Sequence, residues 1–309
     1  MTRSAELGER GAPCSHASTL SVMSFNLGGF VGTRPKTHHW TRRAPLVVDL
    51  LRACSPDLLA AQEVQPGNIP ALQQALPDHA VFWGRATHVR PPSAKATRNP
   101  IFWRRDRFRC LLAGSFFLSE TPSAWSRGWG AAHVRGATWV HLRCRKTERG
   151  LLMCSIHLDH RSRSAREWGS RLIIGRLGAV WHGRRGPIVV AGDFNSRAWA
   201  PRDEDRAAYP PPVLPDYLPE GGAIHNLYTS ASFKDAFLEA GGVDGLETNT
   251  YHDFLGERFP PAALRIDWIL YKDGADQLTP RRLEVVREPR SDTFPSDHYP
   301  VLAHFSWGG

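Results

Sequence analysis

The sequence predicts an α/β protein in which two mixed β-sheets pack face to face with helices outside, a four-layer α/β/β/α sandwich. Many short apolar segments of strand length are separated by turn residues, and only two long segments show helical periodicity. Several predicted strands follow one another directly, whereas a doubly wound parallel sheet has a helix after almost every strand. With 309 residues, 41% of them apolar, the chain can bury an extensive core.

The first part of the chain predicts a strand, a helix and a second strand after a polar tail. Residues 1–17 are polar, so we expect a disordered tail followed by a single domain over residues 18–309. A strand is expected at Leu20–Phe25. Apolar residues at helical spacing predict a helix over Trp40–Cys54. A Ser-Pro pair ends this helix, because a residue before proline disfavours helical geometry, and Asp57–Gln62 follows as a buried strand.

The middle of the chain predicts a run of strands and a second amphipathic helix. The helix is expected over Ser164–Trp181, where apolar residues recur on one side. A five-residue apolar strand, Pro187–Ala191, comes after it. The strands expected before this helix are Ala80–Trp83, Pro100–Trp103, Phe108–Leu118, Ala137–Leu142 and Leu151–His157.

The last third begins with a segment rich in proline, glycine and charge. Residues 199–228 are therefore expected to form a long surface loop, and loops of this length are usually functional lids or disordered insertions. A short helix is expected at Phe233–Ala240. The remaining predicted strands are Thr248–Phe254, Arg265–Tyr271, Arg282–Arg287 and Tyr299–Phe305.

Composition narrows the classes of function without selecting one. The net charge of +9 suits a polyanionic partner, but only five of the 39 basic residues are lysines, and such an arginine bias can equally reflect a GC-rich genome. The five cysteines lack the C-x-x-C spacing of a zinc site and do not form a disulfide framework. No apolar signal segment or membrane-length apolar run occurs, so we expect a cytoplasmic monomer with no membrane contact.

Polar residues that can bind metal or move protons recur just past apolar strands. Strand ends on one rim of a sheet converge in space, so these side chains can share one cleft. Asp267 differs from these residues, because it lies within an apolar run, where a carboxylate needs a partner. That partner can belong to the site, or Asp267 can form a structural ion pair with an arginine. The strand-end residues are Asn26, Glu63, His157, Asp193, Asn195, Asp297 and His298.

This residue set fits metal-assisted hydrolysis. Carboxylate and amide oxygens are ligands that Mg²⁺ prefers, and a histidine held by a carboxylate can carry protons. Each motif taken alone has a simpler explanation: an Asp-His pair usually faces solvent, and the Gly-Asp-Phe-Asn segment at 192–195 can be an ordinary Asx turn. The hypothesis therefore depends on the whole set.

Four ordered motifs carry a family resemblance. They are Asn-Pro-Ile-Phe-Trp at 99–103, Leu-Ser-Glu-Thr-Pro at 118–122, Ile-His-Leu-Asp-His at 156–160 and Ser-Asp-His-Tyr-Pro-Val at 296–301. Together with the strand-end residues, they resemble the endonuclease/exonuclease/phosphatase (deoxyribonuclease I-like) superfamily, and within it a bacterial subgroup related to the carbon-catabolite-repressor deadenylases. The resemblance runs from Met23 to about Phe305 and implies a four-layer α/β sandwich and phosphoester hydrolysis.

The resemblance also implies a metal site. Glu63 corresponds to the principal ligand of Mg²⁺, for which Mn²⁺ can substitute; Asn26 assists it, and so does Asp297, depending on metal occupancy. The turn after Asn26 is Leu-Gly-Gly, where many subgroup members have an arginine or tyrosine close behind, so the phosphate contacts made there are left open.

Five further residues correspond to catalytic positions. By resemblance, Asp193 orients or deprotonates the attacking water, and Asn195 holds the phosphate or that water. His298 contacts the scissile phosphate and is oriented by Asp267, while His157 is a second phosphate-binding or proton-donating histidine. Attack is expected in line, without a covalent enzyme intermediate.

The substrate is left open between two main classes. A phosphatase or phosphodiesterase of a small phosphorylated metabolite is favoured by the lid-like loop and by Trp125, Trp129 and Trp199, which we expect to be exposed. A nuclease or deadenylase-like exonuclease is favoured by the positive charge and by the arginine-rich stretch 98–109. A lipid phosphodiesterase is disfavoured, because it would need an exposed apolar anchor and the sequence shows none. A non-enzymatic binding module is disfavoured, because it has no reason to keep the whole acidic and histidine set.

Overall fold

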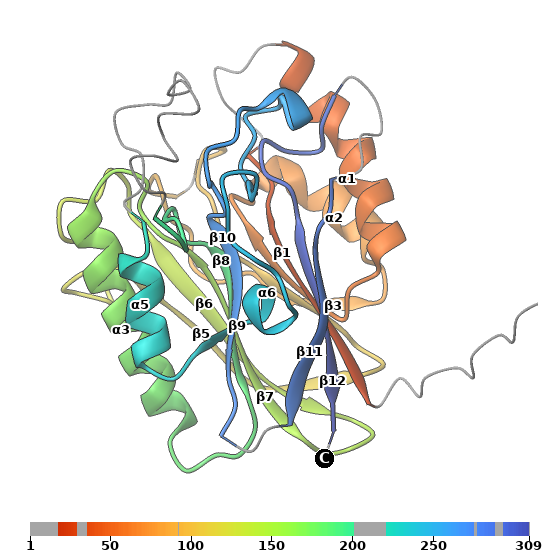
Figure 1. Cartoon of the computed structure of the whole chain (residues 1–309), viewed down its shortest axis with the longest axis vertical. Coiled ribbons are helices and arrows are strands. Elements are labelled where there is room, and N and C mark those ends of the chain that lie inside the picture. Colours follow the sequence, from red (N-terminus) through yellow and green to blue (C-terminus); the bar gives the residue numbers. More distant parts are fainter. Residues whose placement is uncertain are drawn as a thin grey trace, which may run out of the picture.

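Two six-stranded β-sheets pack against each other in the computed structural model, with helices on their outer faces (Figure 1). The structure describes residues 18–29, 36–91, 93–200, 221–274, 277–287 and 293–308. The predicted four-layer α/β sandwich is confirmed.

The first sheet has the strand order β11-β12-β1-β2-β4-β3. Its central strand β1 pairs in parallel with β2 and antiparallel with β12. Side chains of β1 alternate, so that Leu20 and Val22 face the second sheet while Met23 and Phe25 face the helices. The strands are β1 (Thr19–Asn26), β2 (Leu58–Gln62), β3 (His79–Phe82), β4 (Ile101–Arg104), β11 (Leu278–Val285) and β12 (Val301–Trp307).

The second sheet has the order β5-β6-β7-β8-β10-β9. Strands β7 and β8 are parallel, whereas β10 runs antiparallel to β8. Its inner face supplies residues such as Met153, Val189 and Ile269 to the core between the sheets. The strands are β5 (Phe108–Phe117), β6 (Gly136–Cys144), β7 (Gly150–His157), β8 (Ile188–Asp193), β9 (Lys234–Asp235) and β10 (Asp267–Lys272).

Helices cover the outer face of each sheet. Helices α1 (Trp40–Cys54) and α2 (Ile69–Ala75) pack on the first sheet. Helices α3 (Arg163–Trp181) and α5 (Ala223–Ser230) pack on the second (Figure 1). Helix α3 begins at an N-cap, Ser162, whose Oγ accepts a hydrogen bond from the Ala165 amide at 3.1 Å. The short helices are α6 (Ala236–Glu239), η1 (Lys36–His38), η2 (Pro66–Asn68) and η3 (Gly256–Arg258).

The sequence predicted most elements correctly, but several segments differ from the prediction. Residues 248–254 are not a strand; they form a loop with a single bridge between Tyr251 and His298. The predicted helix at 233–240 starts instead as the two-residue strand β9, which leaves only the four residues of α6. Helix α2 was not predicted. β11 also begins at Leu278, earlier than expected, because it pairs with β12 along its length.

The last part of the predicted surface loop at 199–228 is helical. Residues 223–230 form helix α5, which buries Ile224 and Tyr228 against the second sheet. Residues 201–220 and the predicted tail at 1–17 lie outside the described residues. In the part of the chain that is described, no helix has the length and apolar character needed to cross a bilayer.

Candidate active site

The predicted residues meet at one end of the sandwich because of strand direction and register. Parallel strands β1 and β2 end together, which places Asn26 at the same level as the residues that lead to Glu63. Parallel strands β7 and β8 pair His157 with Asp193. Strand β10 starts here, and its first residue, Asp267, pairs with Asp193. Residues far apart in the sequence therefore share one rim.

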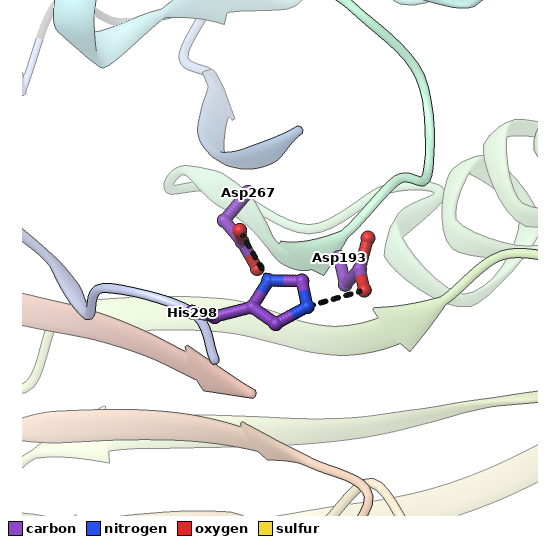
Figure 2. Close-up of side chains that lie close together, drawn as sticks. All are labelled: Asp193, Asp267 and His298. Atoms are coloured by element: carbon purple, nitrogen blue, oxygen red, sulfur yellow. Dashed lines mark hydrogen bonds and ion pairs between the residues drawn. The ribbon is translucent and has the colours of Figure 1, made fainter. Parts of the chain in front are cut away.

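A buried histidine–carboxylate pair lies at the centre of this rim. Figure 2 shows the His298 ring between two carboxylates, with Nδ1 2.9 Å from Asp267 Oδ2 and Nε2 3.9 Å from Asp193 Oδ2. The same Asp267 oxygen accepts a hydrogen bond of 2.7 Å from the Thr250 hydroxyl. Burial opposes the charge on His298, but the carboxylates, Asp267 first, raise the pKa of His298 to about 10. The ring is therefore an imidazolium at neutral pH.

Both carboxylate oxygens of Asp193 contact polar groups. Its Oδ2 accepts a hydrogen bond from Asn26 Nδ2 at 3.0 Å and lies 3.4 Å from His157 Nε2, while its Oδ1 accepts one from the Asn195 amide at 2.8 Å. Burial, and then the negative charge of Asp267, raise the pKa of Asp193 to about 7. A carboxyl with this pKa can take up a proton near neutral pH.

His157 and Asn195 complete this half of the rim. Burial, followed by the positive charge of Arg135, lowers the pKa of His157 well below its ordinary value, so its ring is neutral at pH 7. Asn195 has a left-handed backbone (φ 46°), and its Nδ2 donates to the Leu158 carbonyl at 3.0 Å. A non-glycine residue at positive φ is a strained position of the kind that clusters at functional sites.

Asn26, Glu63 and Asp297 form the other half of the rim. Asn26 Nδ2 lies 3.5 Å from Glu63 Oε1, and the Gly28 amide donates to Asn26 Oδ1 at 3.0 Å. Ser296 Oγ lies 2.6 Å from the Asn26 carbonyl and 3.1 Å from Asp297 Oδ1, which ties Asp297 to the end of β1. Glu63 also has a left-handed backbone (φ 56°).

A glycine leaves room beside the Glu63 carboxylate. Gly29 has a φ of 67°, and a Cβ placed on it would lie 3.3 Å from Gln65 Oε1 and 3.5 Å from Glu63 Oε2. A side chain at this position would be strained in its backbone and would press on the Gln65 amide, while it would be in ordinary contact with the Glu63 carboxylate.

A second set of atoms in the site could also hold a cation. Among the described residues, Asp193, Asp267 and His298 form a buried group whose potential ligand atoms lie within 4.8 Å of one another. The sequence placed the metal instead at Glu63, Asn26 and Asp297, on the adjacent half of the rim. The structure therefore brings the predicted residues to one rim, and the group that could hold an ion there differs from the one predicted by resemblance.

The alternative explanation for Asp267, an ion pair with arginine, is wrong. Its partners are His298 and Thr250. The nearest arginine in the sequence, Arg265, pairs with Asp235 at 2.9 Å and Asp244 at 2.6 Å instead. The polar partner required by the apolar surroundings of Asp267 is thus the site histidine.

Two supporting residues were missed in the sequence. Thr250 lies in the segment that was wrongly predicted as a strand, and its Oγ also accepts hydrogen bonds from the Ile266 and Asp267 amides at 3.0 and 3.1 Å. It fixes both the backbone and the carboxylate of Asp267. The second is Arg43 of α1, which is 1% exposed.

Arg43 joins two loops of the site through backbone carbonyls. Its guanidinium donates to the carbonyls of Leu27 at 2.6 Å, Gly29 at 2.6 Å and Pro295 at 2.8 Å. The first two follow Asn26, and the third precedes the 296–298 segment. The spacing of Arg43 with Val47, Leu50 and Leu51 put it on the buried face of the helix, a signal that could have identified it.

Replacing Arg43 with methionine is expected to lower the free energy of unfolding by about 3 kcal/mol, because several buried carbonyls lose their donor. Urea denaturation measures the effect. The matched control is Arg42→Met, one residue away and exposed, which should change stability by about 0.5 kcal/mol or less. Equal stability of the two variants would contradict the role assigned to Arg43.

Two buried arginines, Arg135 and Arg166, contact the end of the Ile-His-Leu-Asp-His motif. Arg135 is buried, with Nε 3.6 Å from Asp159 Oδ2 and Nη2 3.1 Å from His160 Nδ1. Arg166 is also buried and donates to the Asp159 carbonyl at 2.9 Å. They hold the loop that follows His157, whereas Arg161 is exposed.

Comparison with protein families matches residues 23–298 to the endonuclease/exonuclease/phosphatase family. The chain belongs to this family. It is therefore a phosphoester hydrolase, since members and structural neighbours are phosphatases, nucleases and phosphodiesterases. The predicted family resemblance is confirmed, and the family generally uses divalent metal ions.

Solved structures of the family share the fold over nearly the whole chain. An endonuclease/exonuclease/phosphatase family protein from Bacteroides thetaiotaomicron has a TM-score of 0.76 at 24% identity, covering 94% of this chain and 95% of that one. The mannosyl-6-phosphatase of the same organism also has a TM-score of 0.76, at 23% identity, with 93% and 100% coverage. The catalytic domain of human Nocturnin with a bound sulfate anion has a TM-score of 0.67, at 19% identity and 94% coverage of each chain. At these identities the likeness shows the fold. A comparison with curated proteins finds no match.

Proposed function

We propose that this family member is a Mg²⁺-dependent hydrolase that directs water in line onto the phosphate of a small phosphorylated metabolite. The observation that carries the proposal is the buried arrangement of Asp193, His298 and Asp267. It combines a carboxyl that can accept a proton near pH 7 with a cationic histidine held by a second carboxylate. Hydrolysis of a phosphoester needs both, one for the water and one for the phosphate.

The metal belongs with Glu63, Asn26 and Asp297. Glu63 and Asp297 offer carboxylate oxygens, the donor chemistry that suits Mg²⁺, with Mn²⁺ as a substitute. Asn26 Oδ1, which accepts a hydrogen bond from the Gly28 amide in this structure, would complete the set. The other group is a poorer choice, because His298 Nδ1 is already hydrogen-bonded to Asp267 and the ring is cationic. When bound, the metal supplies positive charge that neutralises the phosphate oxygens.

The remaining residues position the water and the phosphate. Asp193 receives the proton of the attacking water, and Asn26 holds the Asp193 carboxylate through its 3.0 Å hydrogen bond. His298 presents its Nε2 proton to a phosphate oxygen, because Asp267 occupies Nδ1. His157 and Asn195 flank Asp193 and contact the phosphate or the water.

The arginines of residues 98–109 favour a small substrate over nucleic acid. Arg104 pairs with Asp106, Arg107 with Asp57, and Arg109 with Glu148. Arg98 donates to the Gly84 carbonyl at 2.8 Å. Three of the five arginines in this stretch are therefore paired with carboxylates, whereas Arg98 and Arg105 bond to carbonyls and keep their charge, so the stretch offers a phosphate backbone fewer free cations than its sequence indicates. Of the three tryptophans expected to be exposed, Trp125 is 40% exposed, and Trp129 and Trp199 are half-buried.

The neighbours include both substrate classes and do not decide between them. One is a mannosyl-6-phosphatase, another binds a sulfate, an analogue of phosphate, and a third is complexed with a single-strand DNA product. A nuclease or deadenylase-like exonuclease is the second candidate, favoured by the net charge of +9.

Turnover of a substrate panel with Mg²⁺ tests the proposal. Sugar phosphates, nucleotides, single-stranded RNA and nicked DNA are compared by kcat/KM, with the purified Asp193→Asn protein as the control for contaminating phosphatases. Sugar phosphates should be the best substrates. Faster metal-dependent cleavage of RNA or DNA would replace this proposal with the nuclease, and no turnover of any phosphoester would overturn both.

A further inference from the structure

A cavity of about 870 Å³ lies at the end of the sandwich opposite the active site. Strand β1 connects the two: Thr19 lines the cavity, and Asn26 lies in the active site. Seven residue steps of a strand span about 23 Å, so a ligand in the cavity cannot touch the catalytic residues. The C-terminal end of β12 borders the same cavity, close to the marked C-terminus in Figure 1.

An ion pair and hydrogen bonds connect the residues of the cavity wall. Asp57 pairs with Arg107 and accepts hydrogen bonds from the amide and hydroxyl of Ser21 at 2.8 and 3.0 Å. Arg107 also donates to the Thr19 carbonyl at 2.5 Å. Leu20 and Phe305 also border the cavity, but both are 1% exposed and pack into the core between the sheets behind its wall. A binding site built in this way needs little ordering when a ligand enters.

The charges around the cavity do not balance. Its two carboxylates are both engaged, Asp57 by Arg107 and Asp106 by Arg104 at 2.8 Å. Three further cations line the cavity, namely Arg145, Lys146 and Arg281. None of the three forms an ion pair with any carboxylate of the described residues. A concave surface lined by charge of one sign concentrates the opposite charge.

Two of the unpaired cations are held in place. Arg145 Nε donates to the Arg105 carbonyl at 2.8 Å, and Arg281 Nε donates to Ser306 Oγ at 2.7 Å. Each bond uses Nε and orients the guanidinium, whose terminal nitrogens suit the oxygens of a phosphate or carboxylate. Arg145 comes from the turn after β6 and Arg281 from β11, so the cations approach the cavity from both sheets.

We propose that this cavity is a second binding site, which takes a phosphorylated small molecule at Arg145, Lys146 and Arg281. The volume is that of a small-molecule site, and the lining combines apolar surface with a few cationic groups, as organic phosphates require. A bounded cavity fits a nucleotide-sized ligand better than an extended strand of nucleic acid. The site is independent of the catalytic residues and does not rest on the proposed reaction.

Equilibrium binding of ADP to the full chain tests the proposal, measured by calorimetry in EDTA so that no phosphoester is turned over. The Lys146→Glu/Arg281→Glu protein should bind ADP about tenfold more weakly or worse, because two charge-assisted contacts are lost. Both residues are exposed, so folding should persist, and thermal unfolding checks this. The variant's kcat without ADP should equal that of the wild type.

The matched control is Arg171→Glu on the outer face of α3, an exposed arginine remote from both sites that should bind ADP normally. Equal affinity of the double variant and the wild type would place ADP elsewhere and overturn the proposal, as would no binding to the wild type. A single-stranded oligonucleotide that binds more tightly than ADP and is lost in the double variant would assign the surface to nucleic acid instead.

Discussion

Replacing Asp193 with asparagine is expected to lower kcat by about 10³-fold while the protein stays folded, because proton transfer by a positioned side chain contributes about 10²–10⁴-fold. The substitution keeps the size of the side chain and its acceptor for the Asn195 amide. It removes a carboxyl whose pKa burial raises to about 7. Single-turnover kinetics with saturating substrate and metal measure the chemical step.

The control for this prediction is a buried aspartate far from the site. Asp57→Asn loses an ion pair with Arg107 in the same molecule, so it should lower the free energy of unfolding by about 1–3 kcal/mol and leave kcat nearly unchanged. If Asp193→Asn retains nearly full turnover, or if Asp57→Asn loses as much, the assignment of Asp193 as the proton acceptor is wrong.

The site residues that lie at strand ends could be predicted from the sequence. Asn26, His157 and Asp193 each end an apolar run, and strand ends meet on a rim whatever the details of packing. Asp267 was predicted for a different reason, since a carboxylate in an apolar run must have a partner. Its register opposite Asp193 then follows from the antiparallel pairing of β10 with β8.

What depends on loops could not be predicted. Residues 248–254 contain threonines and aromatics that are typical of strands, yet the Thr250 hydroxyl satisfies the amides at the start of β10, and the segment forms no ladder. This competition between side-chain and backbone hydrogen bonding has no periodic signal. Helix α5 was not predicted, because it is only eight residues long and begins directly after glycines that predict a loop.

Glu63→Gln tests the division of the rim into a metal half and a proton half. Replacing Glu63 with glutamine is expected to weaken Mn²⁺ binding by about 10²-fold or more, since even residues that only support a metal ligand contribute 10–100-fold. Turnover with Mg²⁺ should fall by at least as much, and excess metal should restore part of it. Titration with Mn²⁺, followed by electron paramagnetic resonance, measures the affinity directly. Glu167→Gln on the outer face of α3 is the control.

Asp267→Asn separates the two possible metal positions. Asp267 Oδ1 is buried without a hydrogen-bond partner in the described part of the chain, so the carboxylate is the member of the Asp193–Asp267–His298 group with an oxygen to spare. If the ion binds at Glu63, Asp267→Asn should keep the wild-type Mn²⁺ affinity and lose turnover, because His298 loses the carboxylate that holds its Nδ1 proton. The reverse pattern, with affinity lost in Asp267→Asn and kept in Glu63→Gln, would move the metal to the buried group. His298 would then be a ligand, and the phosphate would have to be held by His157 and Asn195 alone.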